Sequence, residues 1–275
     1  MMSINKNDQF TRVYLFLWGM CLLVALLALI FYHLGFRLNN NLQPVKVGAI
    51  ELISNQSEVH VFLDNRERFP EEKDGSYVLS SVSPGLHALL VSKDDFWPWA
   101  KTVMIYPDVT RSLSVFLFES DGLKTETVSA DEKEKLYEQL GSARPFVVWP
   151  DESQPEKQIR SSDGNTALTV QFDTIYVEWV SESEPPPHYF CQENPCTFLM
   201  PVTVSVTPIK SVGFYKDRGD VILFSSGPSI YAIEVDHEDT QNFQPVYKGT
   251  DPYFYVAPDD TLYIQDGTSF LRASL

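Results

Sequence analysis

Residues 13–32, VYLFLWGMCLLVALLALIFY, are twenty consecutive positions without a charged side chain, in an otherwise polar chain of 275 residues. An α-helix of this length covers the roughly 30 Å of a bilayer's hydrocarbon core. No polar stripe interrupts the run, which argues against a helix buried in a soluble core. The segment therefore predicts a transmembrane anchor over residues 13–34, preceded by a short cytoplasmic tail of residues 1–12.

A cleaved secretory signal is the alternative interpretation of this run. Its apolar region normally extends over about 7–15 residues and ends in small residues at a cleavage site. Here the run is longer, and no A-x-A pattern follows it. Aromatic residues lie near both ends, as interfacial rings do: Tyr14 and Trp18 at one, Phe31, Tyr32 and Phe36 at the other. These features favour an uncleaved, single-pass anchor in the lipid bilayer.

The orientation of the anchor rests on the cysteines more than on charge. Lys6 and Arg12 precede the helix, while Arg37 and Lys46 follow it, so the positive-inside count is nearly balanced. A further indication comes from the segment CQENPC, which begins at Cys191.

Cys191 and Cys196 form a candidate disulfide in a loop-like segment, and such a bond requires an oxidising compartment. The rival interpretation, a pair of metal thiolates, needs further ligands, and no second cysteine pair or paired histidine follows. Cys21, inside the apolar run, is interpreted as a small apolar residue of the helix. We predict a cell-membrane protein whose C-terminal domain is extracytoplasmic.

The part of the chain after the anchor is strongly acidic. Setting aside Lys6, Arg12, Arg37 and Asp8 leaves 18 basic and 36 acidic residues after position 38, a net charge of −18. Such a surface disfavours nucleic acid and anionic lipid as partners. Solubility beside a membrane explains the charge without any specific cationic partner.

Residues 45–120 have the two-residue periodicity of short strands. The candidate strands are GAIELIS, EVHVFLD, GSYVLSSV, GLHALLVS, KTVMIY and RSLSVFLF, separated by Asn, Asp, Gly and Pro at turn positions. No helix-length pattern interrupts them. We therefore predict a small β-sandwich in this region. For the whole chain we predict the all-β class, with an N-terminal transmembrane helix.

Residues 47–118 resemble the PEGA domain, a small β-sandwich found mostly in bacterial cell-envelope and surface proteins. Pro84, Gly85 and His87 match the family's Pro-Gly pair and the histidine that begins the following strand. Asp95-Phe96-Trp97 stands where a Gly-Tyr is usual, and the family's Pro-Glu-Gly-Ala tetrapeptide is absent. The resemblance implies a recognition module and carries no catalytic residue.

Phe96, Trp97 and Trp99 cluster around Pro98 and form a candidate aromatic contact patch. Exposed apolar surface of this kind usually marks a contact site for a sugar or a peptide. The competing use is the core of the sandwich, for at least one of the three rings.

Residues 121–162 predict a linker with one short helix over 129–141. Ser129 and Glu132 have the spacing of a capping box, and Gly141 is a suitable helix end. Leu136, Tyr137 and Leu140 give a narrow apolar stripe, typical of a surface helix that leans on a neighbouring domain.

Residues 163–275 contain an internal repeat. DVILFSSGPSIYAIEV (220–235) aligns without gaps to DTLYIQDGTSFLRASL (260–275), and we place a third copy at DTIYVEW (173–179). Strand–turn–strand units at about 40–45 residues are typical of β-propeller blades. Because this length holds three blades at most, we predict a β-meander of propeller-blade-like repeats. The alternative is a propeller that a partner subunit completes. The arrangement is similar to a family of uncharacterised bacterial membrane proteins.

The sequence offers no catalytic, cofactor-binding or metal signature: nucleophile motifs, nucleotide-binding glycines and closely spaced histidines are missing. We therefore predict a non-enzymatic, membrane-anchored envelope protein that presents β domains to a protein or polysaccharide partner. The alternatives are a subunit of an envelope complex that completes a propeller, and a carboxylate-dependent glycan hydrolase.

Overall fold

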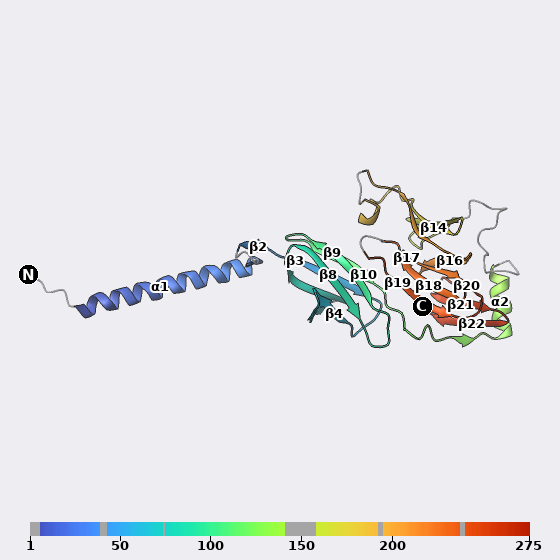
Figure 1. Cartoon of the computed structure of the whole chain (residues 1–275), viewed down its shortest axis with the longest axis horizontal. Helices are drawn as coiled ribbons and strands as arrows, with labels where there is room; N and C mark the ends of the chain where they lie inside the picture. The colour runs from blue at the N-terminus through green and yellow to red at the C-terminus, as the bar shows by residue number, and fades with distance from the viewer. Residues whose placement is uncertain (1–5, 39–42, 74, 141–157, 192–194, 237–239) are drawn as a thin grey trace, which may run out of the picture. The chain divides into compact units, whose positions relative to one another are not determined.

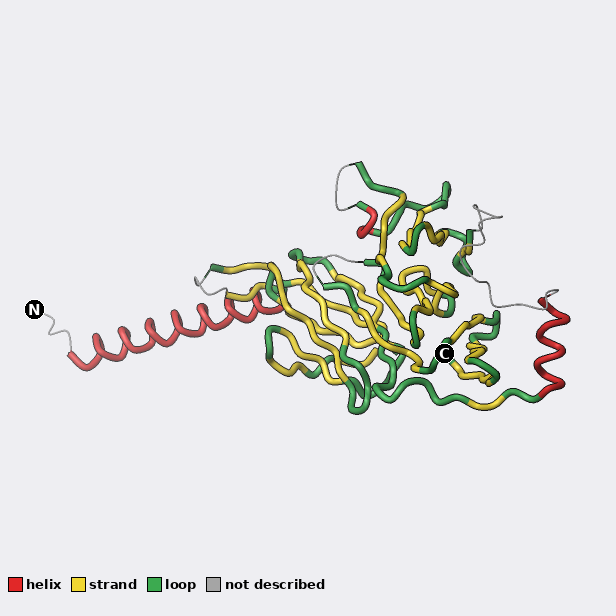
Figure 2. Tube along the Cα trace, turned by 45° about the vertical axis from the view of Figure 1, so that its right-hand side comes forward, coloured by secondary structure: helices red, strands yellow, loops and turns green. Residues whose placement is uncertain are grey.

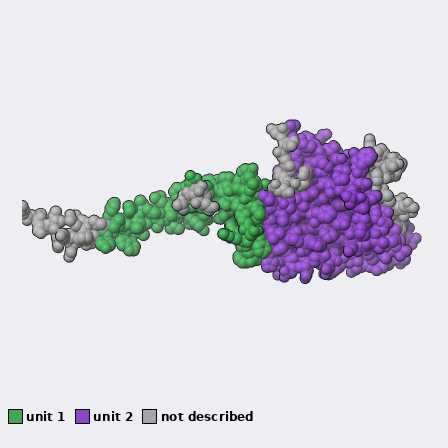
Figure 3. Space-filling view, in the orientation of Figure 1, with its two compact units in different colours: residues 1–55, 61–88, 103–115 green, residues 56–60, 89–102, 116–275 purple. Residues whose placement is uncertain are grey.

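The computed structural model describes residues 6–38, 43–73, 75–140, 158–191, 195–236 and 240–275. Strands dominate the described chain, which confirms the predicted all-β class (Figure 2). The chain divides into two compact units (Figure 3). The first unit comprises residues 1–55, 61–88 and 103–115, and the second comprises residues 56–60, 89–102 and 116–275.

Helix α1 spans Lys6–His33 and contains the predicted anchor (Figure 1). Its Tyr14–His33 portion is long and apolar enough to cross a membrane, and none of it is buried against the rest of the protein. A helix that is apolar on all sides and stays exposed along its length requires another apolar medium around it. A bilayer meets that requirement.

The predicted sandwich region folds into two four-stranded sheets. One sheet has the order β10-β3-β7-β6, with β3 at Gly48–Ser54, β6 at Glu71–Lys73, β7 at Ser76–Val82 and β10 at Thr110–Val115. The other has the order β5-β4-β8-β9, with β4 at His60–Leu63, β5 at Arg66–Arg68, β8 at Gly85–Ser92 and β9 at Trp99–Ile105. A separate ribbon pairs β1 (Phe36–Leu38) with β2 (Pro44–Lys46).

Alternate residues of β3, β4, β7, β8, β9 and β10 are buried, as the sequence pattern predicted, whereas β5 and β6 are exposed throughout. In β3, Ile50 and Leu52 have no exposed surface, whereas Glu51 between them is half-buried. β10 runs parallel to β3, while β7 pairs with β3 antiparallel. The period-2 pattern identified these strands because one face of each is covered and the other is not.

The C-terminal region contains three four-stranded antiparallel sheets (Figure 1). The first repeat sheet comprises β12 (Ile159–Arg160), β13 (Thr166–Gln171), β14 (Thr174–Trp179) and β15 (Leu199–Val204). The second comprises β16 (Ile209–Tyr215), β17 (Arg218–Ser226), β18 (Ser229–Glu234) and β19 (Phe243–Lys248). The third comprises β20 (Pro252–Val256), β21 (Thr261–Asp266), β22 (Ser269–Ser274) and β11 (Glu126–Thr127). None of these sheets closes on itself.

The structure confirms one predicted repeat alignment and corrects the other. Strands β17 and β21 are both the second strand of their sheets, as the alignment of 220–235 with 260–275 requires. The third copy at 173–179 is wrong by one strand, because β14 is the third strand of its sheet and corresponds to β18. A shared irregularity supports this register: Tyr176 faces Pro201 beside a bulge, and Tyr231 faces Pro245 in the same way.

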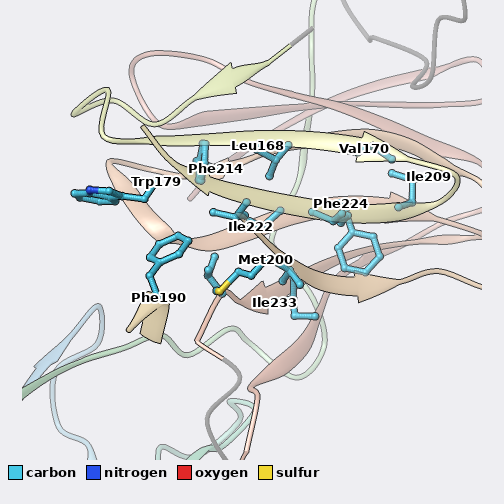
Figure 4. Close-up of a cluster of buried hydrophobic side chains, with 14 residues drawn as sticks. Leu168, Val170, Trp179, Phe190, Met200, Ile209, Phe214, Ile222, Phe224 and Ile233 are labelled. Atoms are coloured by element: carbon cyan, nitrogen blue, oxygen red, sulfur yellow. The ribbon is translucent and has the colours of Figure 1, made fainter. Parts of the chain in front are cut away.

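The first two repeat sheets share one apolar core (Figure 4). Side chains from the first sheet, among them Leu168, Met200 and Trp179, belong to the same buried cluster as Ile222 and Phe224 of the second (Figure 4). A short 3₁₀ helix, η1 (His188–Phe190), adds the buried ring of Phe190 to the same cluster. Shared burial of this kind makes the two sheets one packed body.

Helix α2 spans Ala130–Leu140 and lies within the predicted helix 129–141. The Ser129 hydroxyl accepts a hydrogen bond from the Glu132 N–H at 3.2 Å, as an N-cap does. Leu136 packs with Val128 and Phe270 in a small buried cluster, against which Tyr253, Tyr255 and Tyr263 also lie. The linker thus supplies both the fourth strand of the third sheet and a helix that covers part of it.

Candidate functional site

The structure retains only part of the predicted aromatic patch. Trp99 is fully buried on β9, so it cannot contribute to an exposed platform; this part of the prediction is corrected. Phe96 is half-buried and Trp97 is 38% exposed. The Trp97 N–H donates to the Phe118 carbonyl at 2.9 Å, which fixes this segment. Trp99 is buried because β9 places it on the covered face, in register with Val103 and Ile105.

Asp95 explains how a sequence without glycine makes the turn before Phe96. Its φ is +66°, a backbone conformation that glycine adopts freely and that aspartate tolerates better than most residues. The Lys93 ammonium lies 5.1 Å from the centre of the Phe96 ring. The aromatic pair Phe96-Trp97 therefore occupies an ordered turn with one cation beside it.

Two side-chain amides bind the neighbouring backbone inside the second unit. The Asn242 Oδ1 atom accepts from the Ala100 N–H at 2.9 Å, and its Nδ2 donates to the Ala100 carbonyl at 3.0 Å. The Gln244 Oε1 atom accepts from the Phe118 N–H at 3.1 Å. Its Nε2 donates to the carbonyls of Pro98 and Phe116 at 3.3 and 3.4 Å. These amides imitate a strand partner for residues 98–100 and 116–118.

A buried charge cluster lies next to Asn242. The Lys101 ammonium is 3.1 Å from Glu234 Oε1 and 3.0 Å from Asp236 Oδ2, and the side chains of all three are at most 8% exposed. Lys101 also donates to the Asp236 carbonyl at 3.2 Å. His188, which is half-exposed, lies 3.6 Å from Asp236. The cluster thus joins one buried cation to two buried carboxylates.

Burial raises the pKa of the Glu234 carboxyl, although the Lys101 ammonium and the Asn242 amide act in the opposite direction. A perturbed carboxyl beside a buried lysine is a pattern seen in active sites and also in structural ion networks. Here the polar atoms of Lys101 and Glu234 form ion pairs and hydrogen bonds with other groups of the protein. The arrangement therefore holds residues 98–102 to the end of β18.

His87 sits in a constellation that has the composition of a catalytic triad. Its Nδ1 is 2.7 Å from Asp64 Oδ2, and its Nε2 is 2.7 Å from the Ser83 carbonyl and 3.4 Å from the Ser83 hydroxyl. A carbonyl only accepts, so Nε2 donates to it and has no lone pair to activate the hydroxyl. Asp64 also accepts from the Ala88 N–H at 3.1 Å. This constellation closes the turn before β8.

Cys191 and Cys196 are joined by a disulfide, and Cys21 is a free cysteine. Cys191 directly follows η1, whose Phe190 packs against Trp179 with ring centres 6.1 Å apart. Burial and the nearby carboxylate of Asp220 raise the pKa of Tyr189. The disulfide therefore lies next to an aromatic pair that is packed in the core of the first two repeat sheets.

Within the described ranges, no three His, Cys, Asp or Glu side chains come together as a metal site. Sequence reasoning did not find Lys101, Asn242 or Gln244. A signal for Lys101 was present, since it occupies an inward register position between Trp99 and Val103. A charged residue at such a position requires a buried partner.

No family model matches the chain, and no curated protein matches it. Among solved structures, a Bacteroides fragilis protein of unknown function, described as membrane-associated, matches at 10% identity over 82% of this chain and 93% of that one, with a TM-score of 0.21. A Bacteroides thetaiotaomicron protein described as a phosphatase matches at 11% identity over 81% of this chain and 50% of that one, with a TM-score of 0.18. Likenesses this weak carry no argument about fold or function.

Proposed function

We propose that the chain is a single-pass cell-membrane protein that presents extracytoplasmic β domains to a protein or polysaccharide of the cell envelope, without catalysis of its own. The observation that carries the proposal is helix α1, whose apolar surface from Tyr14 to His33 has no protein cover. The Cys191–Cys196 disulfide supports an oxidising location for the domain. The resemblance of residues 47–118 to PEGA modules supports a recognition role.

Two constellations bear on the enzymatic alternatives. In the first, both ring nitrogens of His87 lie at acceptor oxygens, and Nε2 is closer to the Ser83 carbonyl than to the Ser83 hydroxyl. In the second, Glu234 and Asp236 are buried and share Lys101, whereas a glycan hydrolase needs its carboxyl pair open to the substrate. Both sets of residues are used to hold the fold together, and this favours the binding role.

The propeller-completing alternative requires free faces at the ends of the repeat array. The third repeat sheet has α2 packed on it through Leu136 and Phe270. A helix in that position occupies surface that a partner's blade would need. This favours a self-contained array over one that a partner closes.

Topology and redox state test the proposal together in intact cells. External protease should remove the domain after residue 40, and thiol labelling of the full chain under denaturing conditions should modify Cys21 alone until a reductant is added. Full protection from protease, or three labelled thiols before reduction, would reverse the orientation. For the binding role, crosslinking of intact envelopes should retain the chain in a defined complex; a chain that stays uncrosslinked and binds no envelope glycan contradicts it.

A further inference from the structure

The first and second repeat sheets carry the same pair of adjacent turns at one end. In the first sheet, the Ser205 N–H donates to the Asp173 carbonyl at 2.8 Å, and in the second the Gly249 N–H donates to the Pro228 carbonyl at 2.7 Å. The strand registers agree, since Thr174 faces Val204 as Ser229 faces Lys248. These hydrogen bonds and registers define equivalent positions in the two sheets.

The side chains at the equivalent positions are more apolar in the first sheet than in the second. The second sheet has Gly227, Lys248 and Thr250, whereas the first has Phe172, Val204 and Val206. Phe172 is 95% exposed, Val204 is 70% exposed and Val206 is fully exposed. We call these three side chains of the first sheet the turn patch. Single exposed apolar residues are common, but three on adjacent turns, with none at the matched positions, form a patch.

Phe172 also has an unfavourable backbone conformation. It begins the two-residue turn between β13 and β14 with φ +48°, followed by Asp173 at φ +59°. Hairpin turns of this kind favour Asn, Asp or Gly, and a bulky residue at positive φ is an outlier. The matching positions Gly227 and Gly267 have φ of +57° and +58° with glycine. Phe172 therefore stands where stability favours glycine, and it gains no burial in return.

We propose that the turn patch is the contact site for a second protein, one with an apolar pocket in a basic surface. The patch protrudes as side chains at turn tips, and such tips fit a concave pocket. The net charge of −18 after position 38 disfavours an anionic bilayer and complements a basic partner. Valines offer no hydrogen bonds to a sugar. The inference rests on the proposed binding role and narrows its partner to a protein.

A photo-crosslinking side chain placed at position 172 of the full chain, in cells that make the protein, tests the contact. A matched probe at position 267 samples the equivalent turn of the third sheet, where the space beyond Gly267 is open. We expect one protein adduct from position 172 and none from 267. After identification and purification, that protein should bind the wild-type chain at least about tenfold more tightly than V204K/V206T, which installs the residues of the second sheet. Lipid adducts, equal adducts at both positions, or unchanged affinity would overturn the proposal.

Phe172→Gly separates a contact role from a structural one. The melting temperature should stay unchanged or rise by about 2–4 °C, because glycine relieves the positive φ. The reciprocal Gly267→Phe variant should lower it. A clear loss of stability in Phe172→Gly overturns the proposal, since the ring would then serve the fold. If envelope crosslinking captures a partner through other surfaces while position 172 captures none, the patch is wrong and the binding role stands.

Discussion

Lys101 in the second unit and His87 in the first unit each face carboxylates, but at very different depths. The Lys101 cluster is buried on all sides, whereas the Asp64 side chain that pairs with His87 is 52% exposed. When charged groups exposed to water form an ion pair, they exchange contacts with water for contacts with each other, and the net stabilisation is small. Away from water, each charge depends on its partner, and removal of one leaves the other unsatisfied. Removal of one partner should therefore cost little at the turn before β8 and much at the junction at β18.

The largest effect is expected from Lys101→Met. This change leaves Glu234 and Asp236 buried without their cation, and we expect a loss of about 3–5 kcal/mol in the free energy of unfolding of the second unit. Urea titration of the full chain in detergent, followed by tryptophan fluorescence, measures it. An unchanged midpoint would show that the cluster is open to water.

Glu234→Gln is the matched control for that variant. It removes one of two carboxylates and leaves Lys101 paired with Asp236, so the destabilisation should be well below that of Lys101→Met. Equal losses in the two variants would indicate that the hydrogen-bond geometry of the cluster matters more than its charge.

Gln244→Ala should have the next largest effect. It leaves the Phe118 N–H and the carbonyls of Pro98 and Phe116 without their side-chain partner, and a buried unsatisfied group costs about 1–3 kcal/mol. The same urea titration measures it. The exposed Gln171 provides the control, since Gln171→Ala should change the free energy by less than about 0.5 kcal/mol. Similar losses for both variants would show that the hydrogen bonds of the Gln244 amide do not stabilise the backbone of residues 98–100 and 116–118.

The sequence predicted the strands more reliably than it predicted their partners. GAIELIS and GLHALLVS became β3 and β8 because alternation reports one covered face directly. The predicted repeat copy at 173–179 was wrong by one strand. In the other two copies a glycine, Gly227 or Gly267, marks the equivalent hairpin turn, but here that position is Phe172. Strand position follows local chemistry, and an atypical turn residue removes that signal.

The buried charge cluster could not be predicted, because its members come from distant parts of the sequence. Lys101 and Glu234 are far apart in sequence, and only the packing of residues 98–102 beside β18 brings them together. The register of Lys101 showed that it needed a partner, but nothing in the sequence named which of 37 acidic residues would provide it. The aromatic patch was wrong in part because Trp99 shares the covered face of β9 with Val103 and Ile105, whereas Trp97 precedes the strand and is exposed.

A smaller effect is expected from Asp64→Asn. The Asp64 side chain is half-exposed although His87 is buried, so screening by solvent limits the loss to about 1 kcal/mol or less at neutral pH. The measurement is the melting temperature of the full chain, with Asp259→Asn as an exposed control. A loss as large as that of Lys101→Met would contradict the comparison between the two clusters.

The two carboxyls should also respond to pH with opposite signs. Burial opposes ionisation of Asp64, but hydrogen bonds from His87 and Ala88 outweigh it and lower its pKa. Its contribution is therefore present above the unfolded value of about 3.9 and is lost as pH falls through the folded pKa. Burial raises the pKa of Glu234, so its protonated form favours the fold below about 4.3, and that advantage is lost as pH rises. The stability difference between wild type and Asp64→Asn should shrink on acidification, whereas wild type should lose stability relative to Glu234→Gln as pH rises. Unfolding titrations between about pH 3 and 7 measure both differences, and a common sign for the two would refute the assignment of burial as the dominant influence on Glu234.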